Sequence, residues 1–256
     1  MTKVLSIAGS DPSGGAGIQV DLKTFQALGA FGMAIPASLT AQNSKGVKAS
    51  YPVEARAFMD QLETLLSDIR PDGVKTGMLL MPWTVKAVAK AVKKHRIRHL
   101  VVDPVLRASS GRMLLTRDAV QVLRKELFPQ ALLVTPNIPE AEALAGMQIV
   151  DDQDMDYAAG KLLDMGPRYV LIKGGHRRGP AIDTLYGGGV VHSYSTERLK
   201  GSFHGTGCVL SSAITVFIGR GMPVEKAVEK GKQFVEKMLM KAKPVGKGGV
   251  KYFQFT

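Results

Sequence analysis

Residues 204–208, His-Gly-Thr-Gly-Cys, are the segment of this sequence best suited to binding and transferring an anionic group. They precede the apolar stretch Val209–Ile218, which has the composition of a buried helix. Gly205, Thr206 and Gly207 therefore predict a helix start with several unpaired backbone N–H groups at the positive end of the helix dipole. This arrangement suits the charge that develops on a phosphoryl group during its transfer.

Cys208 is the candidate catalytic side chain of this segment. In the first turn of a helix, the same field is expected to lower the pKa of a thiol. A lone helical cysteine is more often an inert core residue. The flanking glycines favour a catalytic role for Cys208 over a role as a core residue.

A second glycine-rich segment, residues 8–17, reads Ala-Gly-Ser-Asp-Pro-Ser-Gly-Gly-Ala-Gly. Four glycines in nine residues let the backbone approach a ligand closely. The spacing fits neither the Walker pattern nor G-x-G-x-x-G. A tight turn between a strand and a helix explains these glycines equally well.

Short apolar runs alternate with amphipathic segments and must position these groups. We expect strands at 3–8, 33–40, 73–76, 99–105, 131–135 and 169–173. We expect helices at 16–28, 54–67, 83–95, 117–127, 139–145 and 157–165. This alternation predicts an α/β fold of three layers, with a mostly parallel central sheet and helices on both faces. Ligands then bind beyond the carboxyl ends of the strands.

The pattern changes in the last third of the chain. Residues 181–186 and 190–195 flank three glycines and predict an antiparallel edge hairpin. Helices are expected at 206–220 and 224–241, and the Gly- and Lys-rich tail 243–256 is predicted to be loosely ordered. Because no linker or internal repeat is visible, we predict that residues 1–256 form one domain.

Composition excludes several classes of protein. One cysteine rules out an internal disulfide framework, and the five histidines lack the spacing of a zinc site. No stretch approaches the ~18 apolar residues of a membrane span, and the amino terminus has no signal-peptide pattern. We therefore expect a cytoplasmic protein with no membrane partner.

The net charge of +12 invites a nucleic-acid interpretation. The densest basic block, residues 86–99, carries apolar residues at helical spacing and no interleaved aromatic residues. It is better explained as the solvated face of a helix, so no specific nucleic-acid partner is predicted.

Taken together, the motifs resemble those of bacterial hydroxymethylpyrimidine/phosphomethylpyrimidine kinases, of the ribokinase-like superfamily. The matching segments are collinear and cover roughly residues 3 to 240: 8–11, 14–19, 21–23, 40–43, 75–78, 102–105, 135–137 with 140–142, 173–176, and 204–208. The resemblance implies ATP-dependent phosphorylation of a pyrimidine alcohol in thiamin synthesis, and of its monophosphate to the diphosphate. It also suggests a homodimer.

The resemblance further implies roles for single residues. Gln42 would read the pyrimidine edge with Asp21 nearby, Met78 would lie against the ring, and Gly9 and Val105 would border the substrate. A buried amide pairs a donor with an acceptor, which suits an aminopyrimidine. Without the resemblance, these residues would be an ordinary loop amide, a solvated helix carboxylate and core packing.

The nucleotide and its metal would be bound at the same edge of the sheet. Asp103 ends an apolar strand, and Glu140 follows Asn137 by three residues at a predicted helix start. These carboxylates would organise Mg²⁺ through water, although Glu140 would also be favourable there simply as charge at a helix start. The resemblance makes four residues candidate contacts to ATP: Lys173, Asn137, Thr206 and Lys237.

Three other functions compete with this one. A pyridoxal kinase shares the fold and the glycine–cysteine segment, while Gln42 and Met78 favour a pyrimidine. A pyrimidine-binding protein without catalysis is a second alternative, which the presence of Cys208, Asp103 and Glu140 opposes. A basic nucleic-acid binder is the third. One departure from the family pattern, Arg107, lies close to the predicted acceptor site.

Overall fold

The computed structural model describes residues 1–108, 111–175 and 181–255. Within them, one nine-stranded sheet has the order β3-β2-β1-β4-β5-β6-β7-β8-β9. The strands span Lys3–Ser10 (β1), Phe31–Asn43 (β2), Gly46–Pro52 (β3), Gly73–Thr76 (β4), Leu100–Val102 (β5), Leu133–Val134 (β6), Tyr169–Ile172 (β7), Ala181–Gly187 (β8) and Val190–Thr196 (β9).

The neighbouring strands β2, β1, β4, β5, β6 and β7, in this spatial order, pair in parallel, which confirms the predicted parallel core of the sheet. β8 and β9 add antiparallel strands at one edge, as the glycine-flanked hairpin predicts. The opposite edge differs from the expectation, because β3 pairs antiparallel with β2. Residues 46–52 are only partly buried, so they lack the apolar run that would have predicted a strand.

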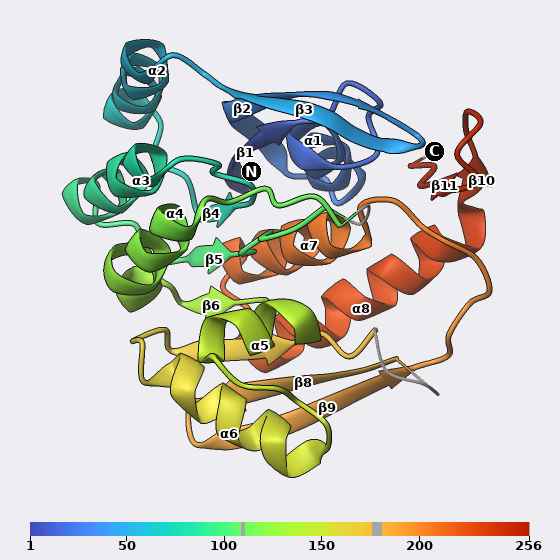
Figure 1. Ribbon diagram of the computed structural model, residues 1–256. Helices are drawn as coiled ribbons and strands as arrows, with labels where there is room; N and C mark the ends of the chain where they lie inside the picture. The colour runs from blue at the N-terminus through green and yellow to red at the C-terminus, as the bar shows by residue number, and fades with distance from the viewer. Residues whose placement is uncertain (109–110, 176–180, 256) are drawn as a thin grey trace.

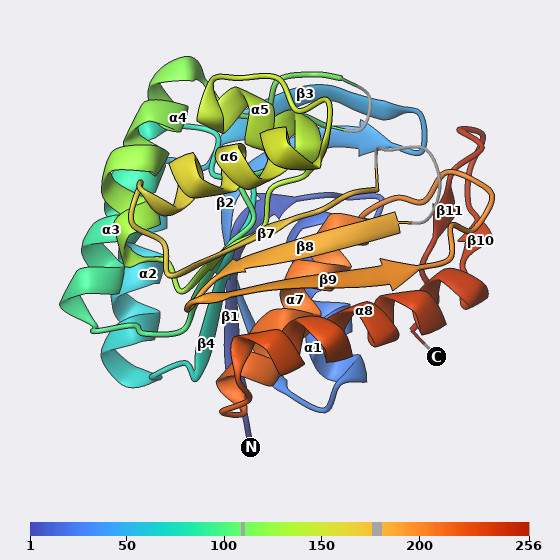
Figure 2. The ribbon, with the colours of Figure 1, turned by 90° about the horizontal axis from the view of Figure 1, so that it is seen from below.

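Helices cover both faces of the sheet (Figures 1 and 2). One layer contains α1, α7 and α8, spanning Gly17–Ala27, Thr206–Gly219 and Val224–Lys241. The other contains α2 (Ala55–Asp68), α3 (Pro82–Lys94), α4 (Arg117–Val122), α5 (Ile138–Ala145) and α6 (Asp152–Leu163). The predicted helix 117–127 is α4 followed by a π-helical turn, Leu123–Leu127 (η1), and a 3₁₀ turn, Phe128–Gln130 (η2).

Side chains of the parallel strands alternate between two cores, because successive residues of a strand point to opposite faces. Leu100 and Val102 of β5 pack among the residues of α2 to α6. Val101, between them, packs with the apolar face of α7 and α8. Both faces of the sheet are therefore dry, and its functional edge is the one where the strands end.

The tail does not match the loose order that the sequence predicted. Lys243–Pro244 (β10) pairs antiparallel with Lys251–Tyr252 (β11), beside the far end of β2 and β3 (Figure 1). Tyr252 and Phe253 are buried at 5% and 6% exposure. Burial of two aromatic rings supplies the free energy that orders this Gly- and Lys-rich segment.

In the described part of the chain, none of the helices has the length and apolar character needed to cross a membrane.

Candidate active site

The carboxyl ends of the parallel strands open into one cavity of about 1100 Å³. Several strand ends contribute to its wall: Ser10 ends β1 and Asp11 follows it, Gly77 and Met78 follow β4, Asp103 follows β5 and Lys173 follows β7. Most of the residues singled out from the sequence line this space: Gly9, Gln42, Met78, Asp103, Val105, Asn137, Glu140, Lys173, Gly205, Thr206, Gly207 and Cys208.

Helix α7 begins at this cavity with Gly205 as its N-cap. Gly205 has φ 81°, and an added Cβ would overlap the carbonyl oxygen of Gly15 in the first glycine-rich segment. No side chain caps the helix, and the N–H of Val209 bonds back to Gly205 O at 3.0 Å. The N–H groups of Thr206, Gly207 and Cys208 precede that bond, so they are available to an anion in the cavity.

Lys173 places a cation against this helix start. Its Nζ donates to Asp103 Oδ1 at 2.9 Å, and an added Cβ on Gly207 would lie 3.2 Å from the same Nζ. The hydroxyl oxygen of Ser211 lies 3.2 Å from the other carboxylate oxygen of Asp103 and 2.9 Å from the carbonyl oxygen of Gly207. Burial alone would lower the pKa of Lys173, but the carboxylates of Asp103 and Glu140 raise it above its ordinary value. Lys173 is therefore fully charged at neutral pH.

Glu140 lies in a capping box at the start of α5. Its Oε2 accepts the N–H of Asn137 at 2.9 Å, and its Oε1 accepts the N–H of Leu106 at 3.1 Å. Burial, and after it the charge of Asp103, raises the pKa of Glu140, while Lys173 opposes the rise. Each carboxylate oxygen keeps a second lone pair, so Glu140 and Asp103 would be able to accept hydrogen bonds from the waters of a hydrated Mg²⁺.

Among the described residues, no three His, Cys, Asp or Glu side chains lie close enough together to bind a metal ion directly. A site built on two carboxylates matches Mg²⁺, which keeps several of its waters.

Cys208 corrects one expectation from the sequence. Burial raises the pKa of its thiol to about 11, although the Lys75 ammonium acts in the opposite direction. Desolvation outweighs the attraction of a helix start and a neighbouring cation, so the thiol is protonated at neutral pH. The predicted low pKa is therefore wrong for the protein without bound ligand.

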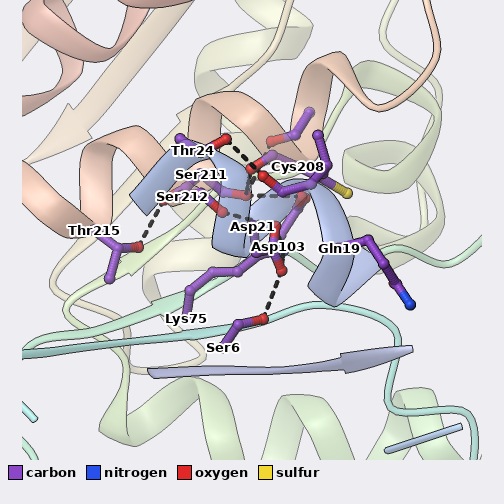
Figure 3. A network of polar contacts seen from close by, with 12 residues as sticks. Ser6, Gln19, Asp21, Thr24, Lys75, Asp103, Cys208, Ser211, Ser212 and Thr215 are labelled. Carbon is purple, nitrogen blue, oxygen red and sulfur yellow. Dashed lines mark hydrogen bonds and ion pairs between the residues drawn. The ribbon is translucent and has the colours of Figure 1, made fainter. Parts of the chain in front are cut away.

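Asp21 also differs from its prediction, because it does not line the cavity. It is fully buried, and Figure 3 shows the network around it. Lys75 Nζ donates to both carboxylate oxygens at 2.9 and 2.8 Å, and hydroxyls donate from Ser6 (2.6 Å) and Ser212 (2.7 Å). A carboxylate with all these donors is already satisfied, so Asp21 supports α1, β1, β4 and α7 rather than contacting a substrate.

Two of the other predicted substrate residues, Gly9 and Met78, lie against each other in the cavity wall. A Cβ on Gly9 would lie 2.9 Å from Met78 Cε, so the missing side chain allows Met78 to lie over the backbone of β1. Val105 has φ 42°, an unusual value for a β-branched residue. Its strained backbone borders the same space.

Lys232 of α8 lines the cavity, whereas Lys237 of the same helix does not. Lys237 lies on the exposed face of α8 and is not among the residues that line the cavity, so its contact to ATP remains a prediction. Lys232 is buried, lines the cavity, and donates to Asp183 Oδ2 at 2.7 Å. Asp183 Oδ1 also accepts the N–H of Gly174, next to Lys173.

Sequence reasoning assigned no role to Asp11, Lys75, His204 or Lys232. The first three lie inside the matching segments. Lys232 had a signal of its own, a lysine on the apolar stripe of α8 that includes Val228 and Val235. His176, from the segment 173–176, lies outside the described residues.

Comparison with known proteins adds an independent result. A family model described as "Phosphomethylpyrimidine kinase" matches residues 11–252. The hydroxymethylpyrimidine/phosphomethylpyrimidine kinase of Bacillus subtilis is 38% identical over 96% of this chain and 92% of its own length. The thiamine biosynthesis bifunctional protein ThiED of Geobacter sulfurreducens is 45% identical, and this chain spans 50% of its length.

Solved structures give the same fold. Phosphomethylpyrimidine kinase from Clostridium difficile superposes with a TM-score of 0.84 at 40% identity, covering 93% of this chain and 100% of that one. Pyridoxal kinase from Staphylococcus aureus, in complex with AMP-PCP and pyridoxal, gives 0.91 at 33% identity, with 100% and 93% covered. The ribokinase-like expectation is thereby confirmed.

Proposed function

This chain belongs to the phosphomethylpyrimidine kinase family, and from that premise we propose that it phosphorylates 4-amino-5-hydroxymethyl-2-methylpyrimidine with ATP. We further propose that it phosphorylates the monophosphate to the diphosphate, and that both steps serve thiamin synthesis. The protein is a phosphotransferase of the ribokinase-like fold.

One observation carries the proposal: the open start of α7 lies against the Lys173 ammonium in the same cavity as Gln42 and Met78. Amide N–H groups and a cation on one side stabilise the equatorial oxygens of a phosphoryl group in transfer. An amide and a thioether on the other side suit a flat heterocycle with donors and acceptors at its edge.

In the proposed reaction, the hydroxymethyl oxygen forms a bond to the γ-phosphorus while the bond to the β-bridging oxygen breaks and ADP leaves. Because burial holds the pKa of Cys208 at about 11, its thiol orients the hydroxyl and does not accept its proton. The proton passes to an oxygen of the transferred phosphoryl group or to water. A loose transition state needs little deprotonation before the new bond forms.

Asp103 and Glu140 are the residues proposed to hold Mg²⁺ through water. The ion would supply neutralising charge to the ATP phosphates. Lys173 then adds a fixed positive charge, and Asn137 positions Glu140 by accepting the N–H of that residue at 2.9 Å.

A coupled assay of ATP turnover, with the pyrimidine alcohol and its monophosphate as separate acceptors, tests the proposal directly. Turnover with both acceptors is expected. Turnover with the alcohol alone would reject the second step, and turnover with neither would reject the proposed substrate.

Pyridoxal kinase is the second candidate, favoured by the likeness to the Staphylococcus aureus enzyme. The value of kcat/KM for pyridoxal, measured beside that for the pyrimidine alcohol, decides between the two. We expect the pyrimidine to be preferred, because Gln42 offers a paired donor and acceptor.

The homodimer and the cytoplasmic location are also proposals, and both rest on the family resemblance. Light scattering on the purified protein measures the first, and cell fractionation measures the second.

A further inference from the structure

His204 has no part in the chemistry above, yet its ring contacts side chains from three separate segments of the chain. Its Nε2 lies 2.9 Å from Asp11 Oδ2 and 2.9 Å from Gln42 Nε2. Its ring packs edge-on against Tyr252 of the tail, with 5.3 Å between the ring centres. The side chain is 17% exposed, so it has little freedom to move.

The Asp11 carboxylate determines that the ring nitrogen Nε2 of His204 carries a proton. The Asp11 carboxylate also accepts the N–H and hydroxyl of Ser13 and the N–H of Ala16. Burial alone would raise the pKa of Asp11, but the hydrogen bonds from His204 and Ser13 lower it below its ordinary value. An ionised carboxylate only accepts hydrogen bonds, so His204 Nε2 must carry a proton and donate it.

A protonated Nε2 determines the orientation of the Gln42 amide. Two donor nitrogens cannot form a hydrogen bond with each other, so Gln42 must present its oxygen to His204. A half-turn of the amide exchanges its oxygen and nitrogen without changing its shape. The stable arrangement therefore has His204 Nε2–H shared between Asp11 Oδ2 and Gln42 Oε1.

Thr40 independently requires the same orientation. Its Oγ1 lies 2.9 Å from the carbonyl oxygen of Ser10 and 3.2 Å from Gln42 Oε1. Thr40 donates its one hydroxyl proton to the carbonyl oxygen of Ser10. The hydroxyl can therefore only accept a hydrogen bond from Gln42. After the half-turn, a Gln42 N–H faces Thr40, and both neighbours are satisfied.

We propose that His204 is a positioning residue that selects the substrate by fixing the Gln42 amide. Thr40 and His204 each use one side of the amide, which leaves one N–H and one oxygen lone pair for the cavity that Gln42 lines. That pair matches an aminopyrimidine, whose ring nitrogen accepts and whose exocyclic amine donates. Pyridoxal has no exocyclic amine. This inference rests on the proposed function, because it names how that site chooses its acceptor.

Two variants separate positioning from packing. His204→Phe keeps a ring against Tyr252 but removes the donor, whereas His204→Gln keeps an N–H near the position of Nε2. We expect His204→Phe to raise KM for the pyrimidine alcohol by roughly tenfold, the effect of one lost hydrogen bond. The KM for ATP should stay within about twofold, because the described side-chain contacts of His204 are to Asp11, Gln42 and Tyr252 and not to Lys173. His204→Gln should recover most of the lost affinity.

The second measurement is the preference of each variant for the pyrimidine alcohol over pyridoxal. The ratio of kcat/KM for the pyrimidine alcohol to that for pyridoxal should fall in His204→Phe and return in His204→Gln. An unchanged KM in His204→Phe, or equal losses for both acceptors and for ATP in both variants, would overturn the inference. Absence of pyrimidine turnover in the unaltered protein would overturn the proposed function, and this inference with it.

A spectroscopic measurement does not depend on turnover. In a long-range ¹H–¹⁵N spectrum of the imidazole groups, His204 Nε2 is expected to resonate as a protonated nitrogen, and Asp11→Asn should shift that resonance. An unprotonated Nε2 in the unaltered protein would contradict the inference, whatever the kinetics show.

Discussion

Gly205 and Gly15 are in backbone contact: a Cβ on Gly205 would overlap the carbonyl oxygen of Gly15. The N-cap of α7 therefore touches the first glycine-rich segment directly, and the two segments form one wall of the cavity although they are far apart in sequence. This contact brings the anion-binding helix start to the end of β1, near the proposed acceptor site.

Gly205→Ala should consequently remove most of the kinase activity, with kcat reduced on the order of 10²-fold, because the helix start must move. Gly221→Ala is a matched control, since Gly221 also has positive φ (84°) but has open space around the added Cβ. The control should lose about 1–2 kcal/mol of stability and keep its activity. Equal activity in the two variants would contradict this account of the contact.

Cys208→Ala is expected to lower kcat by roughly 10- to 100-fold with little change in KM, less than the loss of a full general base. Because burial raises the thiol pKa to about 11, ionisation of Cys208 should not appear in kcat/KM between about pH 6 and about pH 9. Alkylation of Cys208 by iodoacetamide should accelerate with pH throughout that range, because the thiolate fraction is still rising. A tenfold rise in kcat/KM per pH unit that disappears in Cys208→Ala would instead identify the thiolate as the base.

Lys232 and Lys237 lie on the same helix, but their replacement is expected to have different effects on ATP binding and stability. Lys232→Met should raise KM for ATP roughly tenfold and also destabilise the protein by about 3–5 kcal/mol, since Asp183 is left unpaired. Lys237→Met should change neither, because this side chain is exposed. In the double variant Lys232→Met/Asp183→Asn, the melting temperature should recover while KM stays high. A normal KM in that double variant would limit Lys232 to a structural role.

Glu140 gives the site a pH-dependent need for Mg²⁺. Because its pKa is raised, Glu140 takes up a proton at a higher pH than an ordinary carboxyl group. Metal binding should therefore weaken as the pH falls, beginning at a higher pH than for an ordinary carboxyl group, and the Mg²⁺ concentration for half-maximal activity should be higher at acidic than at neutral pH.

In Glu140→Gln, that concentration should be high at both pH values, so the pH dependence flattens. Glu142→Gln is the control, since Glu142 holds the N–H of Ile149 (2.9 Å) and does not line the cavity. Identical Mg²⁺ titrations for the unaltered protein and Glu140→Gln would exclude Glu140 from the metal site.

The C-terminal tail should contribute measurably to stability. Tyr252→Ala removes a buried ring and its hydrogen bond to Ser13 (3.2 Å), so we expect a loss of about 3 kcal/mol or more. Tyr157→Ala should cost less than about 0.5 kcal/mol, because Tyr157 is 64% exposed. Urea unfolding of both variants measures the difference, and equal midpoints would support the loose tail expected from the sequence.

The sequence by itself determined the order and type of most elements. Alternation of apolar runs and amphipathic segments is local, and it predicted the parallel sheet, the edge hairpin and α8 with its observed bounds, Val224–Lys241. It also determined which residues follow each strand. Because parallel strands end at one edge, Asp103, Lys173 and the Gly205–Cys208 segment were expected near one another.

Tertiary structure decided what these groups experience. Whether Asp21 meets a substrate or a buried lysine depends on Lys75, 54 residues away. Whether Cys208 ionises depends on its desolvation, and whether Lys232 or Lys237 enters the cavity depends on how α8 is rotated against the sheet. Local pattern carries no information on such long-range contacts, because burial and charge pairing arise only when distant segments pack together.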